Sequence, residues 1–178
     1  MSIKLISIIA IGIIVFPCFV LADDFDEAVS AYEAGDYQKA YNLLLKEAEK
    51  NNPVAQYNLG FMNQAGKGVK GVRENYKEAL KWYRLAAEQG HLDAQINLGY
   101  MYHNGMGMLK DYKEAIKWYK LAAEKGNALA KCNLAEMYAA GWGTKKDFSI
   151  AKKLAKEGYD AGDDYCRVVW DKYDLANY

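Results

Sequence analysis

The sequence predicts an all-α protein built as an α-α superhelix, which is a solenoid of antiparallel helix pairs. One observation is a repeated phrase: A-Q-Y-N-L-G at 55–60 returns as A-Q-I-N-L-G at 94–99 and, altered, as A-K-C-N-L-A at 130–135. Another is a longer phrase around Trp82 that recurs around Trp118, 36 positions later. A period in the mid-thirties is typical of stacked helical units, each of which needs neighbours to cover its apolar face.

Residues 1–22 are expected to be a signal peptide that precedes this fold. A lysine near the start, an apolar run over 5–16 and a small-residue pattern ending at Ala22 come before the acidic Asp23, which is the order of a cleavable secretory signal. We therefore expect cleavage between Ala22 and Asp23, and a periplasmic or secreted protein. The alternative is a retained membrane anchor, because the 18 residues from 5 to 22 are just long enough to span a bilayer.

Three repeats are expected to form the body of the chain, over 53–91, 92–127 and 128–162. Residues 23–52 are expected to be an N-terminal capping half repeat and residues 163–178 a C-terminal capping helix. Both segments have helical patterns without the full motif, and the end units of an array are atypical because their outer faces meet water.

Each repeat is expected to contain two amphipathic helices. In the unit 92–127, Ala94, Leu98, Met101 and Tyr102 fall at i, i+4, i+7 and i+8, which predicts a first helix over about 93–103. The apolar residues of 111–125 fall on one stripe by the same count and predict a second helix.

Glycine lies in the middle of two predicted first helices, at Gly60 and Gly99. A glycine there costs about 1 kcal/mol relative to alanine, so we expect a close helix crossing to require it. The small Ala135 at the third equivalent position agrees with this expectation, as do paired alanines on the facing helix. Gly107 lies in the predicted loop, where substitution is expected to matter less.

These motifs resemble the Sel-one-like repeat (SLR), a relative of the tetratricopeptide repeat. The resemblance rests on A-x-x-N-L-G, a G-x-G loop and Y-x-x-A-x-x-W-Y-x-x-A-A-x-x-G, and it extends over 53–162. The phrase A-G-D-Y-Q-K-A at 34–40 is similar to half a tetratricopeptide repeat. The resemblance implies a scaffold or adaptor without enzymatic activity that binds a peptide or a protein.

The resemblance also implies where such a partner would bind, because in tetratricopeptide proteins the face of the first helix next to its packed face lines the concave groove. Asparagines at equivalent positions would form a ladder of amides able to bind a peptide backbone, although they could instead hold neighbouring helices together. The predicted partner-binding residues are Tyr57, Asn58, Phe61, Ile96, Asn97, Tyr100, His103, Asn133 and Glu136.

Two other functions stay open at this point. Some cysteine-rich secreted members of the family are described as hydrolases directed at the cell wall or at β-lactams, but they carry a cysteine pair in each unit. This chain has only Cys132 and Cys166 beyond the signal segment. The other alternative is a membrane-anchored regulatory partner, in which case a membrane would be involved through the retained segment.

Cys132 and Cys166 differ by two positions in repeat register. On neighbouring helices that offset is near the limit of about 7 Å between Cα atoms for a disulfide. A disulfide and two buried thiols both remain open.

Other chemistry finds little support in the sequence. The formal net charge of +0 gives no field to attract nucleic acid, and His91 and His103 are the only histidines available for a metal site or a catalytic pair. We therefore expect no nucleic acid, no metal and no cofactor. The phrase G-K-G-V-K-G at 66–71 matches a nucleotide-binding glycine pattern, but it follows a helix and is expected to be a turn. Its basic residues Lys67, Lys70 and Arg73 are expected to form a peripheral contact.

Overall fold

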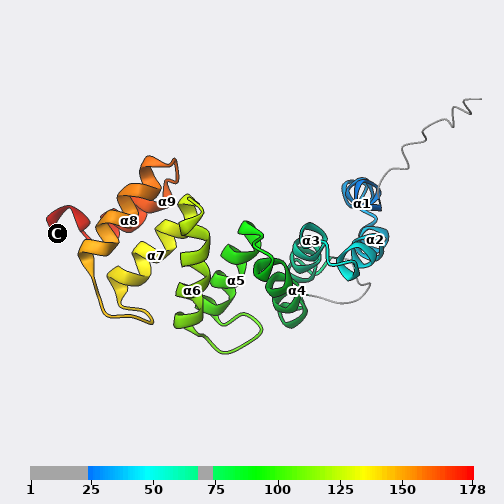
Figure 1. The fold of residues 1–178 in the computed structure, drawn as a ribbon, viewed down its shortest axis with the longest axis horizontal. Coiled ribbons are helices and arrows are strands. Elements are labelled where there is room, and N and C mark those ends of the chain that lie inside the picture. The colour runs from blue at the N-terminus through cyan, green and yellow to red at the C-terminus, as the bar shows by residue number, and fades with distance from the viewer. Residues whose placement is uncertain (1–23, 68–73) are drawn as a thin grey trace, which may run out of the picture.

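The computed structural model describes residues 24–67 and 74–178, and they form a row of stacked helices (Figure 1). Three predicted features lie outside the described residues: the signal peptide, its cleavage site at Ala22 and Asp23, and residues 68–73, which include part of the glycine pattern, Lys70 and Arg73. Within the described ranges the elements are α1 (Asp24–Glu33), α2 (Tyr37–Glu49), α3 (Pro53–Gln64), α4 (Tyr76–Glu88), α5 (Leu92–Asn104), α6 (Tyr112–Glu124), α7 (Ala128–Ala140), α8 (Phe148–Asp160), α9 (Tyr165–Lys172) and the short 3-10 helix η1 (Leu175–Asn177).

The all-α solenoid is confirmed, because each helix packs against the next in chain order from α1 at one end to α9 at the other (Figure 1). We call α1, α3, α5, α7 and α9 the first helices, and α2, α4, α6 and α8 the second helices. Each second helix begins after an aspartate or asparagine whose side chain accepts a hydrogen bond from a backbone N–H of the first turn, as helix caps do: Asp36, Asn75, Asp111 and Asp147.

Aromatic and small residues interlock in the core between the helices. Tyr83 and Tyr119 are fully buried, and the neighbouring Trp82 and Trp118 are buried as well. The aromatic pairs of the repeated motif therefore pack the array and are not open to a ligand.

Gly60 and Gly99 lie directly beneath tyrosine rings. A Cβ atom at Gly99 would lie 2.7 Å from the Tyr119 ring, and one at Gly60 would lie 2.6 Å from the Tyr83 ring. The predicted close crossing is confirmed, although the facing group is a tyrosine and not the expected alanine pair. In the last unit the glycine and the facing tyrosine are both replaced by alanine. Ala135 and Ala155 occupy the two equivalent positions, and both are buried.

The expectation that substitution matters less at Gly107 than at Gly99 is wrong, because the structure constrains Gly107 as well. Its φ is +78°, a value that glycine adopts without strain, and a Cβ atom there would lie 2.8 Å from the Tyr76 backbone. The loop is pressed against the start of α4, so its glycine is as constrained as the glycines within the helices.

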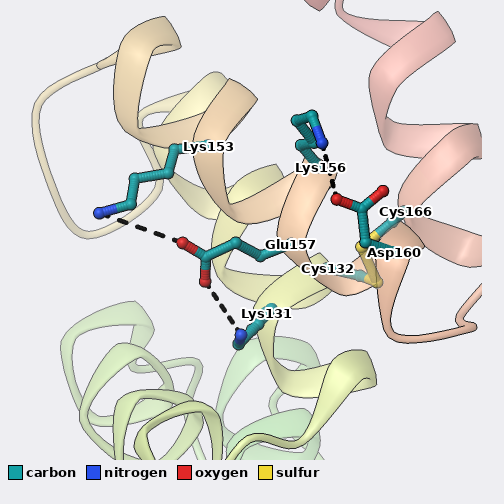
Figure 2. A network of polar contacts seen from close by, with 7 residues as sticks. All are labelled: Lys131, Cys132, Lys153, Lys156, Glu157, Asp160 and Cys166. Atoms are coloured by element: carbon teal, nitrogen blue, oxygen red, sulfur yellow. Dashed lines mark hydrogen bonds and ion pairs between the residues drawn. A yellow bond between two sulfur atoms is a disulfide. The ribbon is translucent and has the colours of Figure 1, made fainter.

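The C-terminal helix α9 packs against both α7 and α8. Cys132 of α7 and Cys166 of α9 are joined by a disulfide, and their Cα atoms are 4.6 Å apart. Figure 2 shows this bridge beside a charged network in which Glu157 accepts a hydrogen bond from Lys131 at 2.9 Å and faces Lys153 at 4.0 Å. The bridge and the network hold the last three helices together.

Candidate partner-binding groove

An open hollow of about 490 Å³ runs across four of the first helices, and we call it the central groove. Four predicted partner-binding residues meet in it, and three further residues complete its border. The predicted ones are Ile96, Asn97, Tyr100 and Asn133, and the others are Gln64, Leu129 and Tyr165.

The walls of the central groove are mostly apolar. Tyr100 is 49% exposed and Leu129 is 38% exposed, whereas Ile96 is buried at its base. Leu129 and Tyr165 were not predicted, because Leu129 lies one turn before the asparagine of its unit and Tyr165 belongs to a helix without the repeated motif. The amphipathic pattern of 163–175 was the one signal that a helix would lie there.

The end of the central groove nearest α3 is closed by a cluster of hydroxyls and amides. The Tyr83 hydroxyl donates a hydrogen bond to Oε1 of Gln64 at 2.8 Å. Burial raises the pKa of both Tyr57 and Tyr83, and the Asn97 amide opposes that rise. Both phenols are therefore neutral hydrogen-bonding groups at physiological pH. The predicted residue Tyr57 is partly covered, since its ring stacks on His91 at 4.6 Å.

Two predicted residues, Asn58 and Phe61, lie in a separate hollow of about 280 Å³ beside α1. The Asn58 amide donates to the Val54 carbonyl of its own helix at 2.9 Å. The expected ladder of three asparagines is therefore not continuous, because only Asn97 and Asn133 share the central groove.

Glu136 is an internal contact and does not face a partner as predicted. Its carboxylate accepts hydrogen bonds from the Tyr165 hydroxyl and from Nζ of Lys172, both at 2.6 Å. Burial opposes ionisation, but the hydrogen bonds from Lys172 and Tyr165 hold the pKa of Glu136 below its usual value. The sequence could not reveal this arrangement, because both partners belong to the C-terminal helix that covers α7.

The predicted residue His103 is directed into an aromatic cluster at the edge of the array. Its ring lies 4.8 Å from the Trp142 ring and 5.4 Å from the Tyr112 ring, edge-on to both. Burial lowers its pKa, so the imidazole is neutral at physiological pH.

A basic residue that was expected to be a peripheral contact, Lys67, instead donates a hydrogen bond to the Tyr32 hydroxyl at 3.1 Å.

The Tyr119 hydroxyl is buried and has no hydrogen-bond partner within the described part of the chain. Its ring lies against Gly99 on α5, the residue before Tyr100 of the central groove, and its electrostatic interactions are with Tyr165, Tyr100 and Glu136. In the preceding unit the equivalent hydroxyl, that of Tyr83, is bound by Gln64, but the position of Gln64 is taken here by His103. Burial raises the pKa of Tyr119, so the group is a neutral donor.

Residues 24–67 and 74–178 contain neither a candidate metal site nor a candidate membrane span. No group of three or more histidines, cysteines, aspartates or glutamates in these ranges is placed to hold a metal ion. In the same ranges, each helix is too short or too polar to cross a bilayer.

Comparison with known proteins agrees with this architecture. A model of the Sel1 repeat matches residues 30–52, 53–91, 92–127 and 128–163. The crystal structure of a Sel1 repeat protein from Oxalobacter formigenes is 34% identical and has a TM-score of 0.71, over 82% of this chain and 57% of that chain. The crystal structure of c5321, a protective antigen of uropathogenic Escherichia coli with an SLR fold, is 34% identical with a TM-score of 0.74, over 80% of this chain and 31% of that chain.

Similarity to curated relatives is more local. HRD3B of Arabidopsis thaliana, an ERAD-associated E3 ubiquitin-protein ligase component, is 32% identical over 76 residues, which are 43% of this chain and 11% of that protein. The chain spans about a fifth or less of the length of the curated relatives it matches. Because the Sel1 repeat model matches more than half of its residues and the solved structures share its helical array, the chain belongs to the Sel1-repeat family, which is known for protein–protein interaction.

Proposed function

We propose that this protein is a periplasmic or secreted scaffold that binds an extended segment of another protein, or a peptide, in the central groove. The observation that carries the proposal is the convergence of side chains from four first helices on one open hollow. Its exposed aromatic residue, Tyr100, offers an apolar contact, and its amides offer hydrogen bonds to a peptide backbone.

We infer that this binding is not coupled to catalysis. The residues that border the groove are amides, phenols and aliphatic side chains, and they include no nucleophile paired with a base. The hydrolase alternative depended on a cysteine pair in every unit. Here Cys132 and Cys166 are joined in one disulfide between α7 and α9, which supports a structural role for them.

The same disulfide supports the proposed location. Disulfides persist in oxidising compartments such as the periplasm and the extracellular space, and they are rare in the cytosol. The expected signal peptide agrees with this. Sequencing the amino terminus of the exported protein tests the proposal, with Asp23 as the expected first residue. An amino terminus within 1–22 would favour the anchored alternative.

Site-specific photo-crosslinking tests the groove. A photoreactive amino acid is placed at Tyr100 in the groove or, as a matched control, at Leu121 on α6. Leu121 is also a partly exposed apolar residue, with 37% of its surface accessible. We expect a polypeptide adduct in the native envelope fraction at position 100 and not at position 121. Equal adducts at both positions, or none at position 100, would contradict binding in the groove.

A further inference from the structure

We propose that the central groove selects an uncharged, extended stretch of polypeptide through its backbone, and that the Tyr119 hydroxyl donates one of the hydrogen bonds. This inference rests on the proposed function, because it specifies the chemistry of the segment that the groove would bind.

The border of the central groove carries no formal charge, since it consists of amides, phenols and aliphatic side chains. The carboxylate beside it, that of Glu136, is already paired with Lys172 and Tyr165. A charged side chain entering the groove would lose its hydration without gaining an ion pair, which is unfavourable. A segment without charge at its centre avoids this loss.

The polar groups of the groove match a peptide backbone. A side-chain amide offers both a donor and an acceptor, as a peptide unit does. Asn97 and Asn133 both lie in this hollow, and the Asn97 amide also contacts the phenols of Tyr57 and Tyr83. Side chains of an extended segment alternate between two faces, so one set can rest on Ile96 and Leu129 while the other points to solvent.

The Tyr119 hydroxyl adds an unsatisfied donor beneath this surface. Buried polar groups nearly always have a partner, and the equivalent hydroxyl of Tyr83 has one in Gln64. The residues around the Tyr119 hydroxyl include Tyr100 and Tyr165, which also border the groove. In this proposal the half-exposed Tyr100 side chain turns aside, and a peptide carbonyl oxygen reaches the Tyr119 hydroxyl.

Selection from a phage-displayed library of random nonapeptides tests the charge preference. The purified protein is the target, and dissociation constants of the selected peptides are measured by fluorescence anisotropy. We expect peptides without Asp, Glu, Lys or Arg at their central positions, and at least tenfold weaker binding to Tyr100→Ala and Asn133→Ala variants. Peptides that lose binding in these variants yet require a central charged residue would overturn the inference alone. Peptides unaffected by both substitutions, or an empty selection, would overturn the proposed function as well.

The Tyr119→Phe variant tests the buried donor. Removing an unpaired hydroxyl is expected to leave the melting temperature unchanged or raised, while the affinity for a selected peptide falls about tenfold. Tyr83→Phe is the matched control, because it removes a hydroxyl that Gln64 already binds and should lower the melting temperature instead. Wild-type affinity in the folded Tyr119→Phe variant would overturn the donor role.

Discussion

Gly99 and Tyr119 set the distance between α5 and α6. A Cβ atom at position 99 would lie 2.7 Å from the tyrosine ring, so either the ring or the helix must move when one is added. We expect Gly99→Ala to lower the free energy of unfolding by roughly 1–3 kcal/mol through overpacking, measured by urea denaturation. The intrinsic helix preference of alanine acts in the opposite direction by about 1 kcal/mol and is outweighed.

A double-mutant cycle isolates this contact. In a Tyr119→Ala background the ring is gone, and Gly99→Ala should then be neutral or stabilising, as the natural pair Ala135 and Ala155 suggests. An equal cost in both backgrounds would show that the glycine is required for another reason.

His91 makes stability depend on pH. Its Nδ1 atom accepts a hydrogen bond from the Ala94 N–H at 3.3 Å and so caps α5. Burial lowers its pKa below 6.5, although Asp93 opposes the shift. Because the folded state favours the neutral ring, this stabilisation is fully present above pH 6.5 and is lost as the pH falls through the folded pKa. Burial gives His103 a shift in the same direction.

We therefore expect the free energy of unfolding to be lower at about pH 5.5 than at about pH 7.5. Urea denaturation at the two pH values measures the difference. His91→Asn keeps a capping side chain that does not titrate, and His103→Gln restores the residue type found at position 64. The double variant should lose most of the decrease. If the free energy of unfolding of the double variant falls as much as that of the wild type, other titrating groups cause the pH dependence.

At the scale of elements, α9 differs from the other first helices because it packs on α7 as well as on α8. The Cys132–Cys166 bridge and the Glu136 hydrogen bonds both depend on that position. The bridge joins residues 34 positions apart. A loop of this size predicts a loss of about 2–4 kcal/mol in the free energy of unfolding when the bridge is removed.

Hydrogen exchange measured by mass spectrometry locates this effect. In the Cys132→Ala/Cys166→Ala variant we expect faster exchange in α9 and the adjoining turn of α7, with α3 to α6 unchanged, because each unit of an array contacts only its neighbours. The Lys153→Ala variant is the control, since it alters the nearby charged network without touching the bridge. Uniformly faster exchange along the chain would mean that the array unfolds as a single unit.

At the scale of the whole molecule, the central groove belongs to no single repeat. Its border takes residues from α3, α5, α7 and α9, so it exists only when the units are stacked. Binding in such a groove would couple successive units and stabilise the array as a whole. The candidate site is therefore a property of the stacked array and not of any single motif.

Local patterns were sufficient to predict the solenoid, the two helices per unit and the tight crossing at Gly99. The predicted helix over 93–103 became Leu92–Asn104, and the one over 111–125 became Tyr112–Glu124. These features repeat, and they depend on residues within one turn or on adjacent helices. Periodicity in the sequence therefore records them.

Only the tertiary structure decided the arrangement of the C-terminal segment, which lacks the repeated motif. The position of α9 brings Cys132 and Cys166 together, encloses Glu136 and adds Tyr165 to the groove, and it results from packing against two helices at once. Likewise, the change from Gln64 to His103 leaves the Tyr119 hydroxyl without a partner in the described residues. The sequence by itself determined the array and its family, whereas contacts between non-repeating segments decided which residues of its inner face remain open.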